Sequence, residues 1–190
     1  ITLIFVVLTV FVFGCNRQAP IITDDTGSTP ETVNDLVDAN NNFAFDLYAT
    51  YQAQGNVFFS PYSISSAFAM VNEGAKGATA EEINKVFYFP ADISVVRSSY
   101  ANILNEINKE GKEYKLSTAN ALWAQKDYLF LQEYFTNVEK YYGGKATNLD
   151  FINENAKSRT IINSWVEDQT NNKIKDLISD IDPMTRLILT

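Results

Sequence analysis

Apolar residues recur at three- to four-residue spacing through most of the chain, and this pattern predicts a series of amphipathic helices. Short apolar or alternating runs between them predict strands. The expected helices cover residues 29–54, 62–72, 79–87, 93–108, 131–142 and 156–169, and the expected strands cover residues 57–59, 114–124, 145–151 and 186–190. Helices dominate the first half and strands enter later, which favours an α+β fold over a regular βαβ alternation.

Three of the expected helices begin at sequences that suit the first turn. Residues 28–30 place a serine and a threonine directly before a proline, and Ser60–Pro61 repeats the pattern of a capping hydroxyl followed by proline. Residues 79–82 read Thr-Ala-Glu-Glu, which fits a capping box. We therefore expect helices to start at these three places.

The N-terminal segment has the pattern of an export signal. Residues 1–13 form an unbroken apolar run, too short for a comfortable membrane span and similar in length to the core of a signal peptide. The following Gly14 and Cys15 resemble a bacterial lipobox, in which the cysteine becomes the lipidated N-terminus. The alternative is a plain signal peptide or anchor helix with an incidental cysteine. We predict that residues 1–15 are a lipoprotein-type signal segment, and that a lipid on Cys15 holds the protein at a membrane surface.

The rest of the chain divides into a linker and a folded part. Residues 16–30 are polar and rich in residues that break regular structure, so they predict a flexible linker. Residues 31–190 are expected to form the folded domain. The last expected strand, residues 186–190, stops where the chain stops, so we expect a truncated domain with an unpaired strand edge. Such an edge invites pairing with another chain, and self-association is expected.

Composition removes several classes of function. The 15 basic and 23 acidic residues give a formal charge of −8 without a basic block, which argues against nucleic-acid binding. The absence of histidine excludes Ser-His-Asp and Cys-His sites within this chain, and one cysteine cannot form an internal disulfide. Residues 74–77 lack the ending of a phosphate loop, and residues 176–182 lack the glycine and glutamate of a calcium loop. We expect no catalytic residue, metal or cofactor, and an enzyme is the least favoured class.

Four blocks of sequence carry a family resemblance. They are Asn56–Phe87, Leu116–Phe151, Ile162–Ile178 and Arg186–Thr190. In this order they resemble the N-terminal half of a serpin, a family of serine protease inhibitors, and the resemblance extends from about Asn34 to the last residue. It implies an α+β serpin fold, of which this chain holds the helices, part of sheet A and one strand of sheet B.

The resemblance also implies a mechanism. In serpins a serine or cysteine protease cleaves an exposed reactive loop and forms an acyl-enzyme. The loop then enters sheet A as an additional strand and carries the protease across the molecule. The reactive loop lies near the C-terminus in this family, so its reactive-site bond is not in this chain. The expected partner is a target protease, and the expected location is extracytoplasmic, secreted or lipid-anchored at the cell envelope.

Three residues match positions that matter in the family. Ser60 and Ser63 match the shutter serines, behind the point where sheet A opens, and Trp165 lies on the helix that crosses the front of that sheet. Their simpler roles are a helix N-cap worth about 1 kcal/mol for Ser60 and a core anchor for Trp165. Two alternatives to an inhibitor stay open, namely a non-inhibitory serpin with a binding or structural role and an inactive truncated product.

Overall fold

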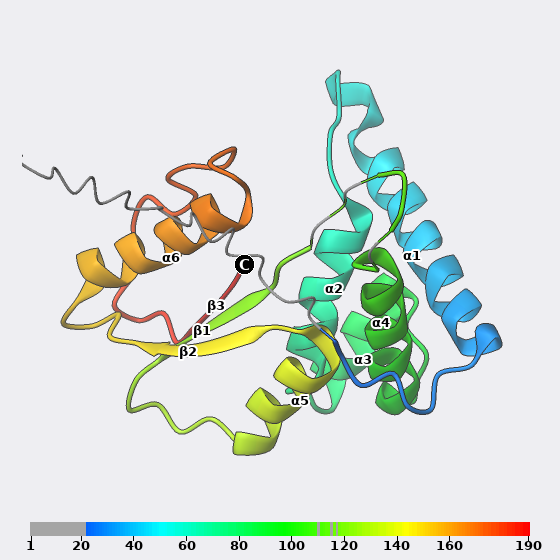
Figure 1. Ribbon diagram of the computed structural model, residues 1–190, viewed down its shortest axis with the longest axis horizontal. Coiled ribbons are helices and arrows are strands. Elements are labelled where there is room, and N and C mark those ends of the chain that lie inside the picture. Colours follow the sequence, from blue (N-terminus) through cyan, green and yellow to red (C-terminus); the bar gives the residue numbers. More distant parts are fainter. Residues whose placement is uncertain (1–21, 110, 115, 117) are drawn as a thin grey trace, which may run out of the picture.

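The computed structural model describes residues 22–109, 111–114, 116 and 118–190 (Figure 1). Its elements are, in order, α1 Pro30–Tyr51, a short 3₁₀ helix η1 Gln52–Gln54, α2 Pro61–Asn72, α3 Ala78–Phe87, α4 Ile93–Ile107, β1 Ala121–Gln125, α5 Gln132–Tyr142, β2 Lys145–Leu149, α6 Asn155–Gln169 and β3 Leu187–Leu189. Four α-helices precede the first strand of a small mixed sheet, and two more lie between its strands, so the predicted α+β class is confirmed.

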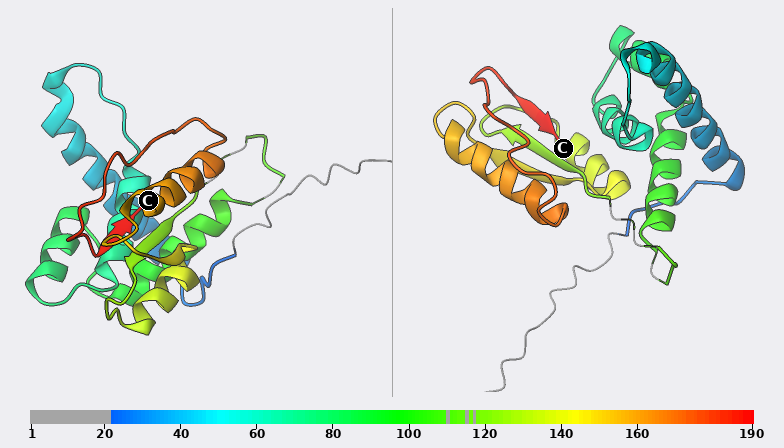
Figure 2. Two further views of the ribbon diagram at one scale, coloured as in Figure 1. Left: turned by 90° about the vertical axis from the view of Figure 1, so that its left-hand side faces the viewer. Right: turned by 90° about the horizontal axis from the view of Figure 1, so that it is seen from above.

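The three strands form one sheet in the order β2-β1-β3. β1 pairs in parallel with β2, with Ala121 opposite Lys145, and antiparallel with β3, with Trp123 opposite Ile188. Helix α6 lies over one face of this sheet and α5 lies against the other (Figures 1 and 2). The central strand is therefore covered on both faces, which agrees with the burial of all five of its residues.

Alternate residues of β1 enter two different hydrophobic clusters. Leu122 and Ala124 face the helices and join the larger cluster, whose other buried members are Leu36, Phe43, Ala69, Met70, Phe87, Phe89, Val96, Tyr100, Tyr134, Val138 and Tyr142. Trp123 faces α6 and joins a smaller cluster with Phe151 and Ile162. This two-residue alternation along the strand is what fixes the sheet between α6 and the helical layer.

The helix starts agree with the sequence at two of three places. Thr29 caps α1 in a capping box with Thr32, and Ser60 caps α2. The predicted capping box over residues 79–82 is wrong. Helix α3 already begins at Ala78, behind Gly77 with a φ of 57°, and no side chain caps it. Gly77 adopts a positive-φ backbone conformation that other residues disfavour. The helix therefore begins directly after Gly77, and Thr79 lies inside the helix instead of capping it.

The expected strands differ from the observed ones in two places. Residues 57–59 form no strand, and Phe58 is fully exposed, because the described chain brings no neighbouring strand to pair with them. The strand expected over residues 114–124 begins only at Ala121, where pairing with Lys145 starts. Both differences follow from the need for a partner strand, which a local alternation pattern does not report.

Part of the predicted linker lies on the folded domain. Thr23 is buried and Asp24 forms an ion pair with Lys140 of α5. Residues 16–21, and Cys15 before them, lie outside the described residues. Across the described part of the chain, no helix is long and apolar enough to cross a membrane.

Candidate functional site

Ser60 and Ser63 lie together at the start of α2. The Ser63 backbone N–H donates to Ser60 Oγ at 3.3 Å, and the Ser63 hydroxyl donates to the same oxygen at 2.9 Å. Both side chains are exposed. The pair therefore forms the helix N-cap that the sequence predicted, on an open surface of this chain.

Small side chains let α2 approach its neighbours closely. Ser65, Ser66 and Ala69 are buried, and the hydroxyls of Ser65 and Tyr100 form a hydrogen bond between α2 and α4. The Ser66 hydroxyl donates to the Ser63 carbonyl at 3.1 Å, so it needs no partner outside the helix.

Trp165 packs where α6 crosses the sheet. Its ring meets that of Trp123 edge to face, with the two centroids 5.6 Å apart. Trp123 is 1% exposed, and its indole N–H donates to Thr190 Oγ1 at 3.0 Å. Trp165 itself is partly buried. It is therefore an anchor of α6 on the sheet, and Trp123 is the partner that the sequence analysis did not name.

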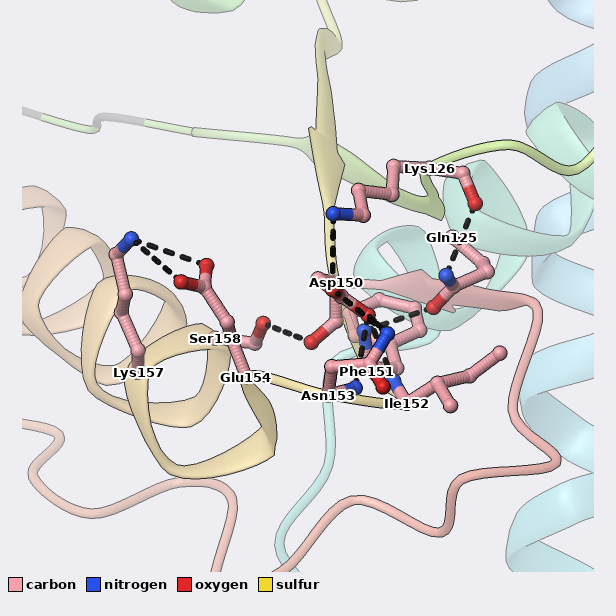
Figure 3. A network of polar contacts seen from close by, with 9 residues as sticks. All are labelled: Gln125, Lys126, Asp150, Phe151, Ile152, Asn153, Glu154, Lys157 and Ser158. Carbon is pink, nitrogen blue, oxygen red and sulfur yellow. Dashed lines mark hydrogen bonds and ion pairs between the residues drawn. The ribbon is translucent and has the colours of Figure 1, made fainter.

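A polar network around Asp150 fixes the start of α6 (Figure 3). The Asp150 carboxylate accepts hydrogen bonds from the backbone N–H groups of Ile152 and Asn153 at 3.1 and 2.9 Å. It also pairs with Lys126 Nζ at 2.9 Å, while the Ser158 hydroxyl donates to the Asp150 carbonyl at 3.0 Å. The Asn153 backbone N–H and the nearby ammonium hold the pKa of Asp150 well below its usual range.

Gln125 links this network to the central strand. Its side-chain oxygen accepts from the Phe151 N–H at 2.7 Å, and its amide donates to the Lys126 carbonyl at 2.9 Å (Figure 3). Gln125 is buried, so both contacts satisfy groups that would otherwise lack partners. The end of β1 and the turn from β2 into α6 are thereby held as one unit. The sequence analysis gave no signal for this network, because Asp150 lies inside the strand predicted over residues 145–151, whereas β2 ends at Leu149.

The segment after α6 is bound along the helix. Asn163 accepts from the Ile178 N–H and donates to the Ile178 carbonyl, both at 2.9 Å. Arg159 donates to the Ser179 carbonyl at 2.6 Å. A polar cavity of about 410 Å³ lies along this seam, with Glu167 and Asp176 among its lining residues. The helix and the segment that follows it therefore cover the sheet together.

The described residues hold no cluster of candidate metal ligands. They contain no group of three or more His, Cys, Asp or Glu side chains that could hold a metal ion. The arrangement instead consists of a covered sheet, a helix anchored across it at several points, and a β3 edge that pairs with no further strand among the described residues.

Comparisons with known proteins agree with this arrangement. Residues 38–190 match the family model described as serpin, serine protease inhibitor. An uncharacterized serpin-like protein from Methanosarcina mazei is 43% identical over 100% of this chain and 48% of its own length. Mouse leukocyte elastase inhibitor A is 41% identical over 81% of this chain and 42% of its own length.

A solved structure shows the same fold. Human thyroxine-binding globulin superposes with a TM-score of 0.72 and 31% identity, covering 83% of this chain and 44% of its own. This chain thus spans about half the length of the relatives that it matches. The family model covers well over half of the chain. The chain belongs to the serpin family.

Proposed function

We propose that the complete protein inhibits serine or cysteine proteases by the serpin mechanism. In this mechanism the protease nucleophile attacks the scissile carbonyl of a reactive loop outside residues 1–190 and releases the new amine terminus. The acylated loop then inserts as a strand beside β3. The observation that supports this proposal is a sheet whose face is crossed by α6 and whose β3 edge pairs with no further strand among the described residues. The resemblance of the chain to an elastase inhibitor points in the same direction.

The site residues have defined parts in this proposal. Ser60 and Ser63 would form the shutter behind the opening sheet, with the small residues of α2 allowing the helix to slide. Trp165 would lie on the helix that is displaced while the strand enters. The contacts of Trp165 with the sheet and of Asp150 with the start of α6 would then oppose this displacement.

Covalent trapping tests this proposal. We expect the complete mature protein to form an SDS-resistant complex with at least one member of a panel of serine and cysteine proteases. The complex should have the summed mass of the protease and the cleaved inhibitor, and an active-site serine-to-alanine protease is the matched control, since it cannot acylate. Cleavage by every protease without a stable complex would contradict the inhibitory mechanism.

A non-inhibitory role in binding or surface structure is the second candidate. It is favoured by the likeness to thyroxine-binding globulin, a serpin-fold protein named for a small ligand. Noncovalent binding, together with simple cleavage of the loop, would support it.

We also propose that the chain of residues 1–190 alone is not inhibitory and that it associates with itself. Its exposed apolar side chains include Phe45, Phe58 and Leu129, and the β3 edge offers unpaired backbone groups. Sedimentation velocity should show oligomers that dissociate in dilute urea before the chain unfolds. A monomer at micromolar concentration would contradict this expectation.

The final part of the proposal concerns location. A signal segment over residues 1–15 and a lipid on Cys15 would place the protein outside the cytoplasm, at a membrane surface. The sequence around Cys15 supports this part of the proposal.

A further inference from the structure

Residues 23–25 form a polar strap across two helices. Thr23 is 3% exposed, and its hydroxyl donates to the Ala101 carbonyl of α4 at 3.0 Å. Its backbone N–H donates to Asn105 Oδ1 at 2.9 Å, while Asn105 Nδ2 donates back to the Thr23 carbonyl at 3.0 Å. A single residue of the predicted linker is therefore bound at its backbone and at its side chain.

The next two residues extend the strap to α5. The Asp24 N–H donates to the Lys140 carbonyl at 2.9 Å, and the Asp24 carboxylate pairs with Lys140 Nζ at 2.9 Å. Asn102 Nδ2 of α4 donates to Asp25 Oδ2 at 3.2 Å. Hydrogen bonds from Thr26 and Lys140 lower the pKa of Asp24 to about 2, so its ion pair is present at neutral pH.

The strap brings the first bound residue of the domain closer to Cys15 along the chain. A lipid on Cys15 would be joined to Thr23 by eight residue steps, a reach of at most roughly 28 Å. If the chain were free as far as Pro30, the reach would be roughly 50 Å. The strap lies at the opposite end of the molecule from η1, which follows the long helix α1 (Figures 1 and 2).

We propose that the strap makes the α4–α5 edge the membrane-facing side of the anchored protein. This inference rests on the proposed lipid anchor at Cys15, and its partner is the surface of a lipid bilayer. The η1 end of α1 then points away from the membrane. Because the strap bonds both helices, the point of attachment lies at this edge of the domain and not at the start of α1.

Chemical coupling tests this orientation separately from natural lipidation. The complete mature protein, starting at Cys15, is coupled through that thiol to a maleimide lipid in a supported phosphatidylcholine bilayer. Neutron reflectometry then measures the gap between the bilayer and the protein. The Asn105→Ala variant removes the hydrogen bonds between Thr23 and the Asn105 side chain and leaves the one from the Thr23 hydroxyl to the Ala101 carbonyl. Asn108→Ala is the matched control in the cap of the same helix, because Asn108 bonds Thr118 and not the strap.

We expect wild type and Asn108→Ala to lie close to the bilayer, and Asn105→Ala to lie farther away, by up to roughly 20 Å. Hydrogen exchange provides a second readout, in which the amides of Thr23 and Asp24 should be protected in wild type. Equal gaps for folded Asn105→Ala and wild type, or unprotected strap amides in wild type, would overturn the proposal. Palmitate labelling of cells, with Cys15→Ser as control, tests the lipid anchor itself, and its failure would leave the strap result intact.

Discussion

Replacing Arg97 with leucine should lower the free energy of unfolding by about 3 kcal/mol, because it leaves a buried carboxylate without its cation. Arg97 Nη2 lies 2.8 Å from Glu73 Oε2, and the Glu73 side chain is fully buried. Tyr142 and Asn137 also donate to Glu73, at 2.9 and 3.3 Å. The cluster joins the C-terminal end of α2 to α4 and α5, so its loss loosens three helices at once.

The loss of unfolding free energy in Arg97→Leu should depend on pH and should be larger at high pH than at low pH. Burial raises the pKa of Glu73, and the hydrogen bonds and the Arg97 charge oppose this rise. Without Arg97 the pKa of Glu73 in the folded state rises further above its pKa in the unfolded state. The stability of the variant is then retained below the unfolded-state pKa and lost as pH rises through the folded-state pKa. Urea denaturation should therefore show a smaller penalty at pH 5 than at pH 8.

Two variants separate this charge effect from a general loss of packing. Lys157→Leu removes a cation from an exposed pair with Glu154, and it should change stability by about 0.5 kcal/mol or less. The double change Arg97→Leu with Glu73→Gln removes both charges, and it should recover part of the loss and abolish its pH dependence. A penalty equal at both pH values would show that Glu73 does not depend on Arg97 for its charge.

Local signals in the sequence predicted the helices and their caps well. Ser60 caps α2 by accepting a hydrogen bond from the Ser63 backbone N–H, so the whole motif spans four residues and can be recognised in the sequence. The face of α6 that carries Trp165 follows from helical spacing, and Trp165 does contact the sheet. The capping box at residues 79–82 failed because the start of α3 is set by Gly77, whose φ of 57° cannot be read from the spacing of hydroxyls and carboxylates.

Contacts between distant residues could not be predicted from such signals. Gln125 meets Phe151 across the end of the sheet, and Thr23 meets Asn105 on α4. In both cases the participating groups are polar, and polar residues in a row resemble a linker or turn until their partners are known. Residues 57–59 illustrate the reverse case, because an apolar run forms no strand without a neighbour to complete its hydrogen bonds.

Trp123→Ala should cost about 4 kcal/mol, since it empties the centre of the cluster between β1 and α6. The side chain is 1% exposed and lies among Phe151, Ile162 and the partly buried Trp165. The substitution also leaves Thr190 Oγ1 without its indole donor. Trp165→Ala should cost roughly half as much, because that ring is only partly buried and leaves a smaller cavity.

A double-mutant cycle isolates the contact that holds α6 on the sheet. The edge-to-face geometry, with centroids 5.6 Å apart, predicts a coupling between Trp123 and Trp165 of about 1 kcal/mol. Urea denaturation of Trp123→Ala, Trp165→Ala and the double variant gives this value, and additive losses would show that the contact between these two rings does not hold α6 on the sheet. In that case the Asp150 network at the start of α6 and the Asn163 contacts near its middle would be the groups that must yield when α6 moves, and these polar contacts would oppose the proposed insertion of a strand beside β3.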